Sequence, residues 1–159
     1  TVEEYLSYQP EPYELLIDSQ TVKEKAFLVA CGNASQYGNN AFIAPHANIQ
    51  DGKMDITILS PFGPLDIAPL AIQLFTKQID RNSKIKTFKG KEVTIIRQNP
   101  GVMHLDGEPI MADSRIEISV LPKSLNVLTP ETVSFTEEVQ NLFGEVTRFF
   151  DKKLPYIFR

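Results

Sequence analysis

Short apolar runs separated by turn residues dominate the first 130 residues of the chain. The most regular run begins Arg115-Ile116-Glu117-Ile118-Ser119-Val120, and its strict alternation predicts an antiparallel strand with one buried face. The other runs are less regular but are bounded by similar turns. We expect strands at residues 13–17, 26–30, 54–59, 85–88, 93–96, 102–105, 115–121 and 125–128. Many short strands and few helices predict a mainly β fold, an antiparallel β-sandwich.

One helix is expected between the strands, because apolar residues return at helical spacing after Asp66. Asp66 is a suitable N-cap, and Pro69 falls in the first turn, where its missing N–H is tolerated. The apolar positions are Ile67, Leu70, Ala71, Leu74 and Phe75. We expect this inserted helix to cover one end of the sheets. Before the first strand, Pro10 and Pro12 predict an extended lead-in.

A second, amphipathic helix is expected near the C-terminus, where Ser134 and Glu137 form a capping-box pattern. Its apolar face consists of Val139, Leu142, Phe143, Val146, Phe149 and Phe150. This face must be covered, either by the sandwich itself, which we favour, or by another domain or a second subunit, as in a homodimer. We therefore divide the chain into a β-sandwich domain at residues 1–130 and a helical extension at residues 131–159.

Composition narrows the classes of function. The chain has 159 residues, of which 42% are hydrophobic and 23% charged, which suits a single folded unit. The net charge of −4, with scattered Lys and Arg, argues against a nucleic-acid partner. No apolar run approaches the roughly 20 residues that span a bilayer, so we expect any membrane contact to be peripheral. A single cysteine, Cys31, and the lack of a signal peptide agree with the cytoplasm.

Several common kinds of catalytic site are missing from the sequence. His46 and His104 lie far apart, and no His or Cys pair has the spacing of zinc ligands. No two glycines are closer than six residues, so neither a P-loop nor a dinucleotide fingerprint can form. Two acidic turns remain, Asp51-Gly52 and Asp106-Gly107-Glu108. Asp-Gly is a frequent hairpin turn, so each turn taken alone indicates structure more than chemistry.

Four sequence blocks taken together are more specific than either turn. They are Gly32-Asn33-Ala34-Ser35-Gln36-Tyr37-Gly38, Ile43-Ala44-Pro45-His46-Ala47, Asp51-Gly52-Lys53-Met54-Asp55 and His104-Leu105-Asp106-Gly107-Glu108. In this order they resemble the carboxy-terminal domain of the diacylglycerol kinase and sphingosine kinase-like lipid kinases. The resemblance covers about residues 8–130. It departs from the family at Gly38-Asn39-Asn40, where many relatives have consecutive glycines, although Asn also tolerates left-handed backbone angles.

The resemblance implies a mechanism and a set of site residues. In that family a preceding nucleotide-binding domain carries a Gly-Gly-Asp-Gly-Thr motif, which this chain lacks. Glu108 corresponds to the catalytic acidic residue that acts as base toward the lipid hydroxyl, with Asp106 and Gly107 near the nucleotide. ATP and Mg²⁺ are the implied cofactors, and a diacylglycerol-like or sphingoid-like lipid is the implied substrate.

The resemblance also implies a structural magnesium site, whose oxygen-only ligands suit a hard cation. Asp51 corresponds to its carboxylate ligand, and the backbone carbonyls of Met54 and Ile56 complete it. We expect Asp51 to lie in a turn beside these carbonyls.

Two other functions stay open on the sequence alone. A non-catalytic β-sandwich module that binds or regulates would keep the fold without chemistry. A relative of the nicotinamide-nucleotide kinases would share the domain plan, although the Asp51 and Asp-Gly-Glu blocks favour lipid kinases. Under the favoured hypothesis the chain is one half of a two-domain enzyme, inactive without its nucleotide-binding partner domain.

Overall fold

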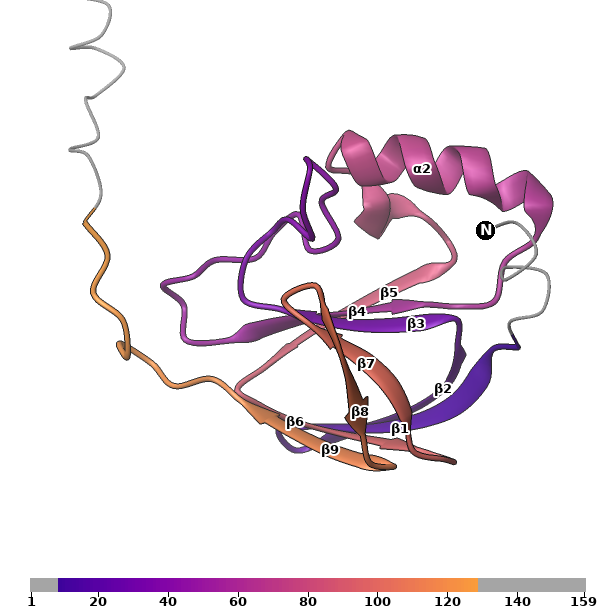
Figure 1. Ribbon diagram of the computed structural model, residues 1–159. Coiled ribbons are helices and arrows are strands. Elements are labelled where there is room, and N and C mark those ends of the chain that lie inside the picture. The colour runs from indigo at the N-terminus through magenta and orange to yellow at the C-terminus, as the bar shows by residue number, and fades with distance from the viewer. Residues whose placement is uncertain (1–8, 129–159) are drawn as a thin grey trace, which may run out of the picture. The chain divides into compact units, whose positions relative to one another are not determined.

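A computed structural model of the chain describes residues 9–128. The chain divides into two compact units, residues 1–124 and 125–159, and every strand and helix of the described residues lies in the first. Within the described residues the structure has nine strands, one α-helix and two short 3₁₀-helices (Figure 1). The predicted C-terminal helix and its capping box lie outside the described residues. None of the helices in the described part of the chain is long and apolar enough to cross a membrane.

The strands form two stacked antiparallel sheets and a separate hairpin (Figure 1). The larger sheet has the order β2-β1-β6-β9, and the smaller has the order β3-β4-β5. The hairpin pairs β7 with β8. The strand bounds are β1 Glu11–Ile17, β2 Gln20–Ala26, β3 Leu28–Gly32, β4 Met54–Leu59, β5 Ile85–Gly90, β6 Glu92–Arg97, β7 Gly101–Leu105, β8 Glu108–Ala112 and β9 Arg115–Ser119. The predicted β-sandwich class is confirmed.

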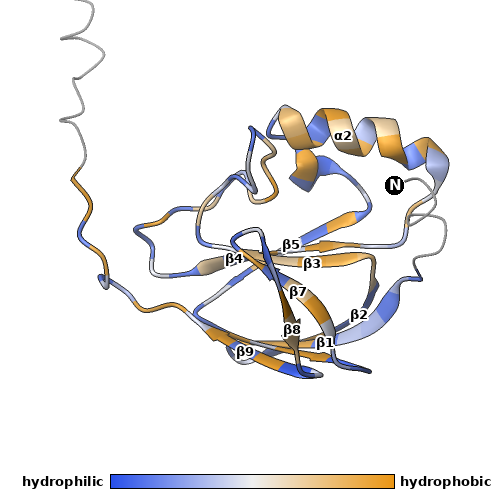
Figure 2. Ribbon diagram, in the orientation of Figure 1, coloured by the Kyte–Doolittle hydropathy of each residue, from blue (hydrophilic) through white to orange (hydrophobic). Residues whose placement is uncertain are grey.

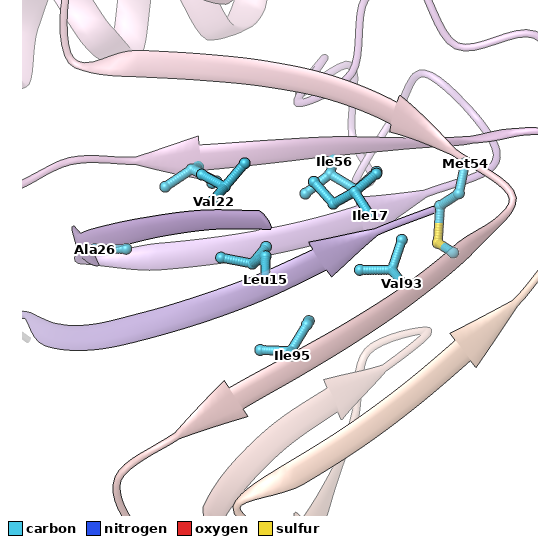
Figure 3. Close-up of a cluster of buried hydrophobic side chains, with 9 residues drawn as sticks. Leu15, Ile17, Val22, Ala26, Met54, Ile56, Val93 and Ile95 are labelled. Atoms are coloured by element: carbon cyan, nitrogen blue, oxygen red, sulfur yellow. The ribbon is translucent and has the colours of Figure 1, made fainter. Parts of the chain in front are cut away.

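The core lies between the two sheets, and alternation along each strand fills it. On the larger sheet, register sets Leu15 of β1 opposite Ile95 of β6, and Ile17 opposite Val93. Ile56 and Ile58 of β4 complete the core from the smaller sheet, and both are fully buried. Figure 3 shows labelled side chains of the two sheets pointing toward one another, among them Ile17, Ile56 and Val93.

The helix α2, Ile67–Phe75, follows the predicted cap Asp66 and contains all five predicted apolar positions, and it lies over the outer face of the smaller sheet (Figure 1). Two 3₁₀-helices flank it, η1 Pro64–Asp66 and η2 Ile79–Arg81. Leu70 packs in a small second core with Ile79 and Ile85. Asp66 holds the N-cap position, but its Oδ2 accepts the N–H of Gly63 at 2.8 Å instead of an N–H of α2.

The apolar stripe predicted for this helix is only partly covered. Apolar residues run along most of α2 (Figure 2), and Leu70 is its one buried residue in the described structure. Ile67 is 45% exposed and Phe75 is 56% exposed. The helix therefore covers the outer face of the smaller sheet, not one end of the sheets as predicted, and it does so with only part of its apolar stripe.

Three strand predictions need correction. The range 26–30 was expected to be one strand, but it spans the end of β2 and the start of β3, which belong to different sheets. The chain changes sheet at Phe27, whose N–H donates to the carbonyl of Leu59. The range 125–128 has no regular structure, so the strand predicted there is wrong. The strand predicted at 115–121 ends at Ser119, just before Leu121-Pro122.

Candidate functional site

The β7–β8 hairpin turns at Asp106-Gly107, as the Asp-Gly pattern indicates. Leu105 pairs with Glu108, so the loop has two residues, and both have positive φ, 50° for Asp106 and 94° for Gly107. These angles are those of a type I′ turn, in which glycine avoids strain at the second position. The turn fixes Glu108 as the first residue of β8, directly after the tip.

The hairpin leaves apolar side chains exposed on both faces. Glu108 shares one face with Leu105, 58% exposed, and Ile110, 41% exposed. The other face carries Val102 and Met111, which are 60% and 71% exposed. Exposed apolar residues gathered on one element are typical of a binding or docking surface. The hairpin therefore presents a carboxylate within an apolar surface.

Arg97, the last residue of β6, fastens the base of this hairpin. Its Nη2 donates to the carbonyl of Gly101 on β7 at 2.7 Å and to that of Ala112 on β8 at 2.6 Å. Its Nε donates to the carbonyl of Asp113 at 3.2 Å. One planar guanidinium thus bonds both strands, a fork that lysine could not reproduce. The sequence did not single out Arg97, because no local pattern marks an arginine whose partners are backbone carbonyls.

Asp51 lies in the predicted turn before β4. Its Oδ1 accepts the N–H of Lys53 at 2.8 Å, and its Oδ2 lies 3.3 Å from Nζ of Lys89. The backbone hydrogen bond from Lys53 and the Lys89 ammonium hold the pKa of Asp51 below its usual value. Met54 and Ile56 are in β4 with buried side chains, so only their backbone could reach a ligand. The assignment of these three residues to magnesium stays a prediction.

Asp55 and Lys89 lie close to the turn at Asp51, although neither was assigned a role from the sequence. Nζ of Lys89 lies 3.1 Å from Oδ2 of Asp55. Asp55 is a buried residue, only 8% exposed. The same Nζ donates to the carbonyl of His46 at 3.1 Å. In the described part of the chain, no group of three or more His, Cys, Asp or Glu residues could hold a metal ion.

A cavity of about 190 Å³ opens beside this cluster, lined among others by Thr57, Asp80 and Lys89. Thr57 donates from Oγ1 to the carbonyl of Ile43 at 2.8 Å, which ties the preceding loop to β4. His46 lies with Nε2 at 3.3 Å from Oδ2 of Asp80. Charged and polar groups from distant parts of the sequence therefore meet on the outer face of the smaller sheet.

The loop at Gly38-Asn39-Asn40, which departs from the family pattern, has positive φ at all three residues. Gly38, Asn39 and Asn40 have φ of 142°, 45° and 61°. Asn tolerates this region better than most residues, so the two asparagines stand where glycines are usual.

Cys31 shows no sign of a reactive thiol. It lies in β3 and packs against the main core. Burial raises the pKa of Cys31 to about 12, so the thiol stays protonated at neutral pH. It acts as a small apolar side chain.

Similarity to solved structures is clear at the level of the fold. A crystal structure of a protein assigned as a diacylglycerol kinase from Bacillus anthracis matches with a TM-score of 0.60 and 22% identity, over 73% of this chain and 40% of that chain. A second diacylglycerol kinase structure from the same organism matches with a TM-score of 0.51 and 19% identity, over 77% of this chain and 47% of that chain. At these identities the likeness shows a shared fold.

Relatives found by sequence similarity also include proteins named as lipid kinases. The chain is 28% identical over 125 residues to a Shewanella frigidimarina protein named "Probable lipid kinase YegS-like", covering 79% of this chain and 40% of the relative. It is 28% identical over 127 residues to a Mycobacterium tuberculosis diacylglycerol kinase, covering 77% of this chain and 39% of the relative. The chain thus spans about 40% of the length of these relatives.

A family model described as the YegS C-terminal NAD kinase beta sandwich-like domain matches residues 1–129. The match includes both sheets, the β7–β8 hairpin and all four of the sequence blocks. It also agrees with the sandwich seen in the structure, and it covers most of the chain. The chain therefore belongs to the family of YegS-type C-terminal domains, β-sandwiches related to those of the NAD and diacylglycerol kinases.

Proposed function

We propose that this chain is the carboxy-terminal half of an ATP-dependent lipid kinase that phosphorylates a hydroxyl of a diacylglycerol-like or sphingoid-like lipid. The observation that carries the proposal is the family match over residues 1–129, supported by relatives that are named lipid kinase and diacylglycerol kinase. The chain spans about 40% of those relatives, which supports a partner domain for the nucleotide.

In this proposal Glu108 is the base. Its carboxylate takes the proton of the lipid hydroxyl as that oxygen forms a bond to the γ-phosphorus of ATP, and the bond from phosphorus to the bridging oxygen breaks to release ADP. Asp106 and Gly107 lie next to it at the hairpin tip and would face the nucleotide. Mg²⁺ bound with ATP would neutralise charge developing on the phosphates.

The hairpin suits such a role for a physical reason. A two-stranded hairpin is marginally stable in water, and this one has apolar side chains exposed on both faces. Covering them with a lipid chain or with the partner domain would remove apolar area from water and would also surround Glu108 with less water.

The chain by itself should be inactive, because phosphoryl transfer needs a phosphate cradle that the sequence does not contain. Positioning both reactants accounts for roughly 7–11 kcal/mol of a barrier, and most of that would be lost. We expect the 159-residue chain to show no lipid phosphorylation and only weak ATP binding. Micromolar ATP affinity with turnover would contradict the proposal.

The substrate class is tested with the protein produced from the complete reading frame that contains this chain. Diacylglycerol, a sphingoid base and NAD would be offered side by side with labelled ATP. Transfer to a lipid supports the proposal, and transfer to NAD alone would identify a nicotinamide-nucleotide kinase instead. Transfer to none of them, with ATP bound, would favour a non-catalytic module.

A further inference from the structure

The strand register places Lys89 at the centre of an acidic site. In the smaller sheet Lys89 of β5 is the direct cross-strand partner of Asp55 of β4. Opposite charges at directly paired positions attract and stabilise the pairing. The turn before β4 brings Asp51 to the same ammonium. Two carboxylates that are four residues apart in the sequence thus share one lysine.

Every donor of this ammonium has an oxygen close by. A lysine ammonium has three N–H groups. Nζ of Lys89 lies 3.1 Å from the carbonyl oxygen of His46, 3.3 Å from Oδ2 of Asp51 and 3.1 Å from Oδ2 of Asp55. The site therefore consists of two carboxylate oxygens and one carbonyl oxygen, which are also the ligand types preferred by Mg²⁺ and Ca²⁺.

The ammonium of Lys89 is the positive charge that balances the buried carboxylate of Asp55. Oδ2 of Asp55 is buried and has no hydrogen-bond donor in good geometry among the described residues, so the ammonium is its counter-charge. Burial lowers the pKa of Lys89, but the contacts with Asp55 and Asp51 outweigh burial and raise it above its ordinary value. The lysine is therefore charged at neutral pH.

These contacts do not fit a magnesium ion at Asp51. Oδ1 of Asp51 is turned to the N–H of Lys53, and Oδ2 faces the ammonium. A metal ion bound to the same oxygens at roughly 2.1 Å would lie within a few ångströms of a positive charge. The ion and the ammonium would repel each other, so they cannot share the site.

We propose that Lys89 is the resident cation of the Asp51–Asp55 site and that its ammonium occupies the place of a divalent metal ion. It links the turn at Asp51, strand β4, strand β5 and the His46 loop, as a structural metal would. The site takes up Mg²⁺ or Ca²⁺ when the ammonium is removed. This inference is independent of the kinase activity proposed above.

Thermal unfolding of the 159-residue chain tests the proposal, with MgCl₂ or CaCl₂ at millimolar concentration compared with NaCl of equal ionic strength. The variants are Lys89→Met and Lys86→Met, the latter on the same strand and paired with Glu24. With MgCl₂ or CaCl₂ in place of NaCl, we expect no rise in the unfolding temperature of the wild type or of Lys86→Met. Lys89→Met should gain a rise of a few degrees that grows with Mg²⁺ or Ca²⁺ concentration, and adding Asp51→Asn should remove it.

Two results would overturn the proposal. One is a rise in the unfolding temperature of the wild type with Mg²⁺ or Ca²⁺ that Asp51→Asn removes, since the metal would then be the resident cation. The other is a folded Lys89→Met variant that gains no rise.

Amine labelling of the wild type covers the case in which Lys89→Met fails to fold. Labelling of Lys89 should be slower than that of the exposed Lys25 and unchanged by millimolar Mg²⁺. Labelling of Lys89 as fast as that of Lys25, or labelling that Mg²⁺ accelerates at Lys89 alone, would show that the ammonium does not hold the site.

Discussion

The sandwich and the β7–β8 hairpin are built from similar apolar residues but stand in opposite environments. Leu15, Ile56 and Ile58 in the sandwich are 0% exposed, whereas Val102 and Met111 in the hairpin are 60% and 71% exposed. The sandwich is stabilised by side chains packed between two sheets. The hairpin is attached at its base by hydrogen bonds from Arg97 to backbone carbonyls.

This difference separates stability from the proposed chemistry. The sandwich supplies the buried area that folds the chain, while the hairpin that carries Glu108 adds little to it. Binding and catalytic residues are often placed on such projecting segments, which a rigid scaffold positions.

The largest contrast is expected for one substitution made in both regions. Ile56→Ala removes a fully buried side chain from the core and should lower the free energy of unfolding by about 2–5 kcal/mol. Ile110→Ala removes the same atoms from the exposed hairpin and should cost about 0.5 kcal/mol. Urea denaturation of both variants measures the difference. Equal costs would mean that the hairpin belongs to the core.

Arg97→Lys should loosen the hairpin and leave the sandwich intact. Hydrogen bonds from a charged donor are worth about 1.5–3 kcal/mol, so amide exchange in β7 and β8 should become roughly 10- to 100-fold faster. Amides of β1 and β4 should keep their rates. Arg115→Lys, which affects an exposed pair with Glu117, is the matched control and should change little. Uniformly faster exchange in both sheets would show that Arg97 supports the whole fold.

Gly90 tests how closely the two sheets approach at the end of β5. A Cβ at this position would lie 2.5 Å from Cγ2 of Ile17, so Gly90→Ala should cost about 1–3 kcal/mol. At Gly63 the nearest atom to an added Cβ, Oδ2 of Asp66, is 3.8 Å away, and φ is −105°. Gly63→Ala should therefore be nearly neutral. Thermal unfolding compares the two variants. A Gly90→Ala variant as stable as the wild type would mean that the space beside Gly90 is larger than in the structure.

Asp18 should make the stability of the protein depend slightly on pH. Its Oδ1 accepts the N–H groups of Glu92 and Lys91 at 2.9 Å each, and these bonds lower the pKa of Asp18. A lowered folded-state pKa stabilises the protein above the unfolded pKa, about 4, and this stabilisation is lost as pH falls through the folded value. Wild type should therefore unfold at a higher temperature than Asp18→Asn at pH 7, and the gap should close in acid. A gap that widens in acid would contradict the assignment.

The sequence predicted the elements whose own pattern is strong. Strand β4 was predicted with its observed bounds and helix α2 with its cap Asp66 and its apolar positions, because the apolar run of β4 and the helical spacing after Asp66 are local signals. Strand β2 was missed because Lys23, Glu24 and Lys25 make it polar, which is common in a strand at the edge of a sheet. Strand β8 was missed because Pro109 weakens its pattern.

The candidate site was only partly visible in the sequence. The Asp106-Gly107 turn could be predicted from its residues, and the structure has it at the tip of a hairpin. The meeting of Asp51, Asp55 and Lys89 depends on the register of β4 and β5, which no local pattern specifies. Arg97 was missed for the same reason, since its partners are backbone atoms on other strands.

Lipid phosphorylation by the protein from the complete reading frame, carrying Glu108→Gln or Glu117→Gln, tests whether Glu108 is the base. Both residues are exposed carboxylates at or near the hairpin, but only Glu108 is the proposed base. Loss of a general base typically slows a reaction by about 10²- to 10⁴-fold, so Glu108→Gln should reduce kcat by that factor with ATP binding unchanged. Glu117→Gln should retain the wild-type rate. A Glu108→Gln variant that phosphorylates lipid at the wild-type rate would show that Glu108 is not the base.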